Sequence, residues 1–182
     1  PASLQSIGCR SFAGCDDLTG DLILPNSLVS LGDYAFSNCS GLDGVLVLSE
    51  SLRTIPEAAF YECSGICGEI RIPDSVESIV YNAFCHMPNV TSIVLGSGLR
   101  EVDDIFPRCS NVAKVTFRGT SVPDAVAYLF GNSYFKPTTV YVPESAYDAY
   151  EAAIRPCLPD AQIIGVSAEP LQITEQPQDR YG

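Results

Sequence analysis

The chain has 182 residues, 46% of them hydrophobic, and carries a formal net charge of -12 at pH 7. This length and apolar content are enough for one domain with a sizeable core, which excludes wholesale disorder. The negative charge argues against nucleic acid and anionic membrane surfaces as partners, because phosphate groups require a basic face. No apolar run reaches the roughly 18 residues that a membrane helix needs, so we expect no direct membrane insertion by this segment.

One pattern of apolar residues recurs five times between Leu4 and Phe117. Each copy opens with two aliphatic residues, continues to a Phe with a Cys or Met three positions later, and ends in an alternating apolar stretch. The copies begin at Leu4, Leu28, Leu52, Val76 and Leu99. Self-similarity with a period of roughly 20–29 residues is typical of a leucine-rich solenoid.

Each copy contains two segments with the character of strands. Alternation of apolar residues predicts the first, at 22–24, 46–48, 70–72, 93–95 and 115–117, with the middle residue facing outward. A glycine shortly before this segment, as at Gly20 and Gly68, predicts a bulge or tight bend. The second segment, around 27–31 and 74–79, predicts a shorter strand. The Ala-Phe pair that follows it, such as Ala59-Phe60, predicts a helical or 3-10 turn with the Phe in the core.

Beyond Gly119 the pattern loosens into what we interpret as a C-terminal cap. We expect a helix over 122–130, a strand over 139–142, a second helix over 144–154 and a final pairing at 163–164. A solenoid needs such a cap because its last coil otherwise exposes the core. The predicted leucine-rich repeat domain covers 1–165, with repeats at about 4–143 and the cap at 144–165. Residues 166–182 are polar and predict a linker or tail, and the absence of an initiator Met at Pro1 indicates a piece of a longer protein.

The eight cysteines divide into two groups by their position in the repeat. Four of them occupy one repeat position, which Met87 fills in the fourth copy. A position that accepts Cys or Met favours a small, soft apolar group, so we expect buried, reduced thiols there. These four are Cys15, Cys39, Cys63 and Cys109. The other four lack the spacing of a zinc site; they are Cys9, Cys67, Cys85 and Cys157.

The repeat resembles the BspA-like, or treponemal-type, leucine-rich repeat. The residues that carry the resemblance are Leu-x-x-Leu/Ile-x-x-x-Ala-Phe-x-x-Cys followed by Leu-x-Leu-Pro or Ile-x-Ile-Pro, and residues 74–84 match closely. The resemblance implies a right-handed α/β solenoid with a parallel sheet on one face, short strands or 3-10 turns on the other, and a C-terminal helical cap. It also implies a secreted or cell-surface bacterial protein of a family in which some members are implicated in adhesion. The sequence departs from the pattern at three positions. Pro56 holds the repeat position at which copy two has Gly32, Met87 replaces the Cys, and Pro107 follows Phe106.

Residues for catalysis are scarce, and we expect no enzyme activity and no cofactor. His86 is the only histidine, and its repeat position holds Gly14, Asn38 and Glu62 in other copies, which indicates a solvent-facing loop. A catalytic triad or dyad would depend on that single residue. The carboxylate pairs 16–17 and 103–104 predict solvated loop charge, with a weak calcium site as the alternative.

The outward strand positions are the candidate partner-binding residues, namely Val45, Val47, Glu69, Arg71, Ser92 and Val94. Stacked coils place them on one sheet face, and curved repeat surfaces of this kind bind extended partners. Charges of both signs beside valines favour a protein or glycan partner over a polyanion. Two alternatives remain: these residues serve only to support the sheet, or the domain is a structural spacer within a larger surface protein.

Overall fold

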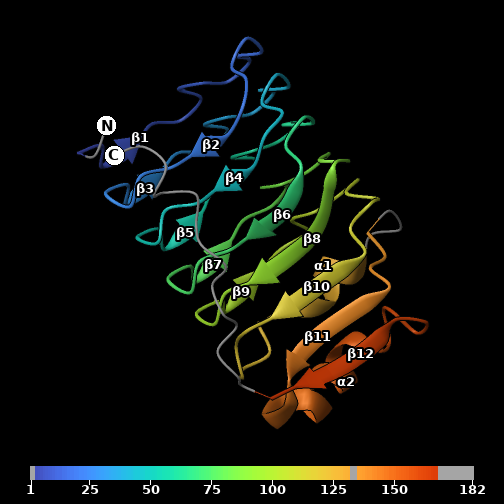
Figure 1. The fold of residues 1–182 in the computed structure, drawn as a ribbon. Coiled ribbons are helices and arrows are strands. Elements are labelled where there is room, and N and C mark those ends of the chain that lie inside the picture. Colours follow the sequence, from blue (N-terminus) through green and yellow to red (C-terminus); the bar gives the residue numbers. More distant parts are fainter. Residues whose placement is uncertain (1–2, 132–134, 168–182) are drawn as a thin grey trace.

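The computed structural model describes residues 3–131 and 135–167. Five coils stack along one axis, with coil one at residues 4–27, coil two at 28–51, coil three at 52–75, coil four at 76–98 and coil five at 99–121 (Figure 1). Coil one, drawn in blue, lies at one end of the stack, and β12, drawn in red, lies at the other. The predicted solenoid is confirmed. Most of the predicted linker or tail lies outside the described residues.

One face of the solenoid is formed by parallel strands, one from each coil and two from the cap (Figure 1). The strands are β2 (Leu22–Ile23), β4 (Leu46–Val47), β6 (Gly68–Arg71), β8 (Val90–Leu95), β10 (Lys114–Phe117), β11 (Thr139–Pro143) and β12 (Gln162–Val166). The first two pair with each other, and the last five form one sheet in the order β6-β8-β10-β11-β12. The predicted bulge is present at the start of β6, where Gly68 has a φ of 80° and the register shifts.

A second row of two-residue strands runs beside this face. The strands are β1 (Ser6–Ile7), β3 (Ser30–Leu31), β5 (Thr54–Ile55), β7 (Ser78–Ile79) and β9 (Glu101–Val102). The row is interrupted between β3 and β5. Pro56 explains the interruption, because it occupies the position at which Gly32 and Val80 donate to the preceding coil, both over 2.9 Å, and proline has no N–H to donate.

The Ala-Phe segments are successive reverse turns and do not continue into a helix. Tyr34 and Asn38 have φ values of 57° and 58°, so the backbone leaves the right-handed helical region every fourth residue. Between them, Ala35 N–H donates to the Gly32 carbonyl within its own coil, whereas Phe36 N–H donates to the Ala59 carbonyl of the next coil over 2.8 Å. Alternating bonds of this kind hold each turn to its neighbour and prevent a continuous helix.

The Phe column forms the centre of the core. The rings of Phe36, Phe60, Phe84 and Phe106 are buried, as predicted, and they stack with centroid separations of 5.2–5.8 Å. The Cys column lies beside it: the thiols of Cys39, Cys63 and Cys109 are free and fully buried, whereas Cys15 in the end coil is only partly buried.

The C-terminal cap is built from α1 (Val126–Gly131), the 3-10 turn η1 (Glu144–Ala146) and α2 (Tyr147–Ile154). The first helix begins later than predicted, because Ala125 has a φ of 61° and keeps the preceding residues out of the helix. Tyr150 and Ile154 of α2 are buried, as the apolar stripe predicts. β12 pairs in parallel with β11 out to Val166.

Candidate interaction surface

Outward side chains of the sheet face form two parallel ladders, one residue per strand. The strand register joins Glu69, Ser92 and Lys114 in one ladder, and Arg71, Val94 and Thr116 in the other. The first ladder is therefore Asp21, Val45, Glu69, Ser92, Lys114, Thr139 and Gln162, and the second is Ile23, Val47, Arg71, Val94, Thr116, Tyr141 and Ile164. Because side chains alternate along a strand, all of these residues belong to the same face.

A polar cluster of Glu69, Arg71 and Ser92 lies near the middle of this face. Arg71 Nη2 lies 3.1 Å from Glu69 Oε1, and Ser92 Oγ donates to Glu69 Oε2 over 3.2 Å. The two charged side chains are 44% and 47% exposed, so the ion pair contributes little to stability but is accessible to a partner. The cluster presents both charges and a hydroxyl in a fixed arrangement.

The apolar members of the face differ in accessibility. Val45 and Val47 are half-buried, and Ile23 is 42% exposed. Val94 is only 5% exposed, so it offers a partner almost no surface, which corrects its prediction as a contact residue. In its ladder Val94 lies between Arg71 and Thr116 of the two adjacent strands.

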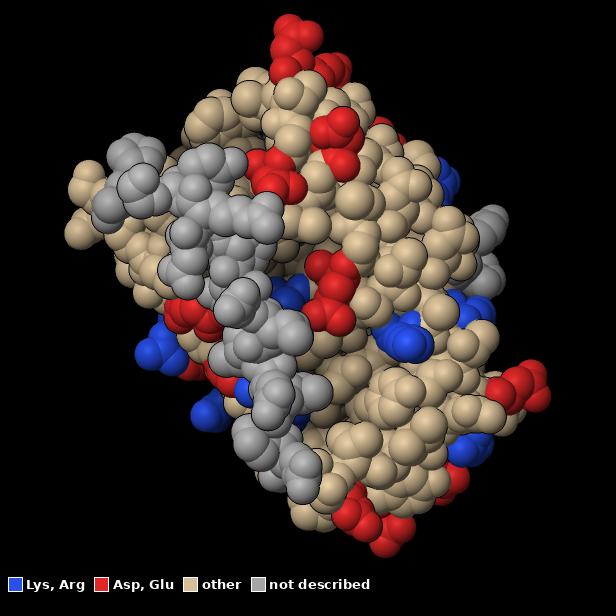
Figure 2. Space-filling model, viewed as in Figure 1, with Lys and Arg blue, Asp and Glu red and all other residues tan. Residues whose placement is uncertain are grey.

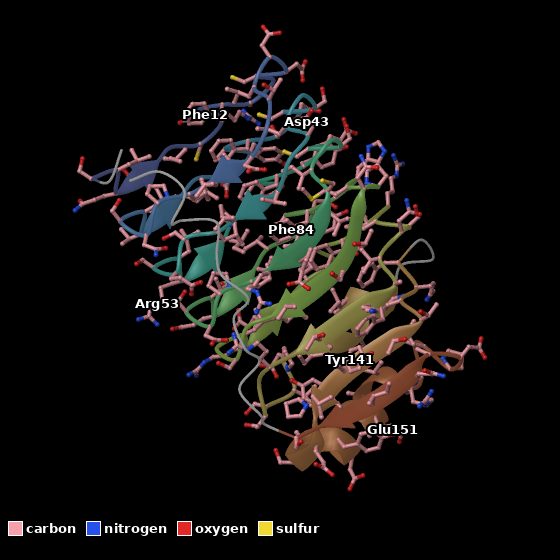
Figure 3. The ribbon with its side chains drawn as sticks, viewed as in Figure 1. Phe12, Asp43, Arg53, Phe84, Tyr141 and Glu151 are labelled. Atoms are coloured by element: carbon pink, nitrogen blue, oxygen red, sulfur yellow. The ribbon has the colours of Figure 1, made fainter. Side chains whose placement is uncertain are left out.

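The face extends further toward the C-terminus than the sequence analysis predicted. Tyr141 of β11 and Ile164 of β12 continue the second ladder, and Tyr141 lies on the same face in Figure 3. The alternation at 139–142 contains the signal for Tyr141, since it matches the strand pattern of the five repeats. Asp74, which follows β6, forms an ion pair with Arg118, which follows β10, with 3.1 Å between Oδ2 and Nη1. No pattern in the sequence predicts this pair.

The sheet face is nearly neutral in a strongly acidic chain. Its two ladders carry two acidic residues, Asp21 and Glu69, and two basic ones, Arg71 and Lys114, against a net charge of -12 for the chain. Figure 2 shows this side as largely uncharged, with acidic and basic groups close together near its middle. The face therefore suits a partner without strong charge, such as a glycan or a mixed protein surface.

In the described part of the chain, the other residues considered for catalysis or metal binding do not come together in a second site. The imidazole of His86 lies near Glu62, with 3.6 Å between Nδ1 and Oε1, and both side chains are partly exposed. Burial raises the pKa of Cys109 to about 12, which keeps its thiol protonated at neutral pH. Within residues 3–131 and 135–167, no group of three or more His, Cys, Asp or Glu side chains could hold a metal ion. In the same part of the chain, no helix has the length and apolar content to cross a membrane.

The stacked coils, the parallel sheet and the buried Phe column define a leucine-rich repeat solenoid. The sequence matches the BspA type leucine rich repeat region in six copies, over residues 1–67 and 45–158. The chain belongs to this family. No curated protein matches it.

Solved structures support the same fold. A leucine rich cell surface protein from Faecalibacterium prausnitzii is 26% identical, with a TM-score of 0.60 over 65% of this chain and 31% of that one. The pneumococcal vaccine antigen PcpA is 19% identical, with a TM-score of 0.75 over 92% of this chain and 40% of that one. A leucine rich repeat protein of T. pallidum is 20% identical, with a TM-score of 0.59 over 91% and 81% of the two chains. The chain thus spans less than half the length of the first two proteins.

Proposed function

We propose that this chain is a non-enzymatic interaction module of a bacterial surface or secreted protein, and that its sheet face binds a protein or glycan, as in adhesion. The observation that carries the proposal is the sheet face itself: a nearly neutral, mixed polar and apolar surface held in register on a chain of net charge -12. A surface on strands is preorganised, so a partner that binds it loses little conformational entropy in the domain.

The surface location is supported by the family and by one structural relative. The F. prausnitzii protein is described as a leucine rich cell surface protein, and its identity to this chain is 26%. We extend that location to this chain as part of the proposal. The partner-binding residues that we propose are Val45, Val47, Glu69, Arg71, Ser92 and, added from the register, Tyr141 and Ile164.

A matched pair of charge exchanges tests the site. The test variant combines Glu69→Arg with Arg71→Glu on the sheet face. The control combines Arg53→Glu with Glu77→Arg, an ion pair of 2.8 Å at the rim beside β5 and β7. Both variants keep the net charge, and both exchange an exposed ion pair whose loss costs little stability.

The probes are a glycan array and a panel of purified extracellular proteins, with circular dichroism to confirm folding. Any ligand found for the native domain should bind the sheet-face variant at least about tenfold more weakly, a loss of roughly 1.4 kcal/mol in binding free energy. The same ligand should bind the control variant with native affinity. Binding should depend only weakly on salt, because the face is nearly neutral. Equal binding by both variants would place the site elsewhere, and the absence of any ligand would favour the spacer.

A further inference from the structure

The strand β12 has a neighbouring strand on one side only. The sheet order is β6-β8-β10-β11-β12, and Figure 1 shows β12, drawn in red, as the outermost strand. Gln162 N–H donates over 2.9 Å to the carbonyl of Thr138, which immediately precedes β11. Because successive residues of a strand direct their backbone groups to opposite sides, Ile163 and Gly165 direct theirs away from β11. Among the described residues no strand pairs with that side, so these N–H and C=O groups form a hydrogen-bonding edge.

This edge lacks the features by which sheet edges avoid pairing with other chains. Those features are charged side chains, proline, a bulge or a covering segment. Residues 161–167 contain no charged residue and no proline, and β12 follows β11 in an unbroken register. Ile164 and Val166 are 36% and 37% exposed, and Gly165 is exposed as well. Although the chain has a net charge of -12, two copies can therefore meet along β12 with no like charges directly opposite each other.

We propose that β12 is a docking surface for β12 of a second copy of this chain, paired antiparallel about a two-fold axis at Ile164. This register places Ile163 of each copy opposite Gly165 of the other, and each such pair exchanges two backbone hydrogen bonds. Within β12 it is the antiparallel register that uses both outward-directed residues of both copies. Ile164 faces its own equivalent across the axis on the sheet face, and Gln162 faces Val166.

The pairing continues the sheet face from one copy into the other. Tyr141 and Ile164 are neighbours in the second ladder, so in the dimer the two second ladders meet at the axis. An antiparallel strand at the edge of a parallel sheet is a common arrangement. The two-fold axis uses the same patch on both copies, so the assembly closes at two copies. A partner with repeated units would then meet two sheet faces side by side; that consequence rests on the proposed function, whereas the association itself does not.

The contact is confined to the strand edge and the side chains beside it. On the inner side of β12 the cap is already in place, since a Cβ atom at Gly165 would lie 3.4 Å from the ring atom Cδ2 of Tyr147 in α2. A five-residue edge buries less than the roughly 1,200 Å² of a stable interface. We therefore expect a reversible dimer with a dissociation constant on the order of 100 μM.

Charges placed at the axis test the pairing. Ile164→Lys and Ile164→Glu each put like charges directly opposite each other in the dimer, and because Ile164 is an exposed sheet-face residue both variants should fold, which circular dichroism checks. Self-association of the full chain is measured by sedimentation equilibrium up to about 1 mM protein, in reducing buffer with about 0.15 M salt to screen the net charge. Each variant should associate with itself at least about tenfold more weakly than the native chain. An equimolar mixture of the two variants should restore association, because opposite charges then meet at the axis.

Ile23→Lys is the matched control. Ile23 is 42% exposed and lies in the same ladder on β2, at the other end of the face. The change in charge is the same as in Ile164→Lys, and self-association should stay at the native level. Hydrogen exchange gives an independent reading, because the amides of Ile163 and Gly165 should exchange more slowly as the native dimer forms.

Three results would overturn the proposal. The first is equal weakening by Ile23→Lys and Ile164→Lys, and the second is a mixture of the two Ile164 variants that associates no better than either alone. The third is a native chain that stays monomeric at about 1 mM. In that case, protected amides at Ile163 and Gly165 would identify another segment of the same chain on the edge, and unprotected amides would leave the edge to an extended peptide of a different protein. No ligand of the sheet face enters this test, so its failure and that of the proposed function are distinguishable.

Discussion

The thiol of Cys63 donates a hydrogen bond to the carbonyl oxygen of Phe36, which lies 3.0 Å away in the preceding coil. The thiols of Cys39 and Cys109 make equivalent bonds of 2.9 and 3.1 Å to Phe12 and Phe84. The Cys column therefore has a polar role besides filling the core: each of these thiols donates to the backbone carbonyl of a Phe in the preceding coil. A buried carbonyl left without a donor would destabilise the fold.

The buried thiols should make the domain less stable in alkali. Burial raises the pKa of Cys109 to about 12, and its thiol in the unfolded chain ionises at about 8.5. Between these values the unfolded state releases a proton that the folded state keeps, so the free energy of unfolding falls by up to about 1.4 kcal/mol per pH unit. Urea unfolding at several pH values above about 7 measures this slope.

Cys109→Ala should reduce that alkaline slope, whereas Cys9→Ala, which removes an exposed thiol, should not. The Cys39 thiol beside Cys63, together with burial, raises the pKa of Cys63 as well, so part of the slope should persist in the Cys109 variant. An unchanged slope after removal of Cys109 would contradict the argument.

The Phe column provides a second matched pair of variants. Phe60 is fully buried between the rings of Phe36 and Phe84, and Phe60→Ala should lower the free energy of unfolding by about 3–5 kcal/mol. Phe12 has one neighbouring ring and is 38% exposed, so Phe12→Ala should cost less than half as much. Denaturant unfolding of the two variants measures the difference, and equal losses would show that coil one is as closed as coil three.

The core columns could be predicted because the same side-chain chemistry returns in every coil. The reverse turns could not, since Tyr34, Ala58 and Glu62 share a positive φ and no side-chain property. The second strand row is interrupted at Pro56 because proline has no N–H. The sequence shows this proline, but only the register of the coils shows that an N–H is needed at its position.

The candidate surface, like the fold, could be predicted in part from the sequence. Alternation placed Glu69 and Arg71 on one face, and the register brings them to Ser92. Strand alternation placed Val94 on the same face, but it does not describe how much of each side chain stays accessible, and Val94 is buried. The ion pair of Asp74 and Arg118 joins residues from different coils, and no local pattern indicates it.

Gly32 should be intolerant of a side chain. A Cβ atom added there would lie 2.3 Å from the backbone nitrogen of Cys9, and a backbone atom cannot rotate away. Gly32→Ala should therefore cost about 1–3 kcal/mol through displacement of coil one from coil two. Gly131→Ala is the control, since no atom lies within 4 Å of its added Cβ. Thermal unfolding should rank Gly32→Ala well below Gly131→Ala, and similar midpoints would show that coil one shifts without cost.

The hydroxyl of Tyr150 should hold the C-terminal cap onto coil five. It lies 2.9 Å from the carbonyl oxygens of both Gly119 and Ser121, and burial raises its pKa to about 12. Tyr150→Phe keeps the ring packing but leaves the buried carbonyl of Gly119 without this donor, which should cost about 1–3 kcal/mol.

Tyr128→Phe removes the same atom from a side chain that is 67% exposed and should change stability by less than about 0.5 kcal/mol. Hydrogen exchange over α2 distinguishes a local effect from a global one. The amides of residues 147–154 should exchange faster in Tyr150→Phe and at the native rate in Tyr128→Phe, because α2 opens when its anchor to coil five is lost. If the two variants exchanged alike across α2, the hydroxyl would not be the anchor, and ring packing alone would close this end of the solenoid.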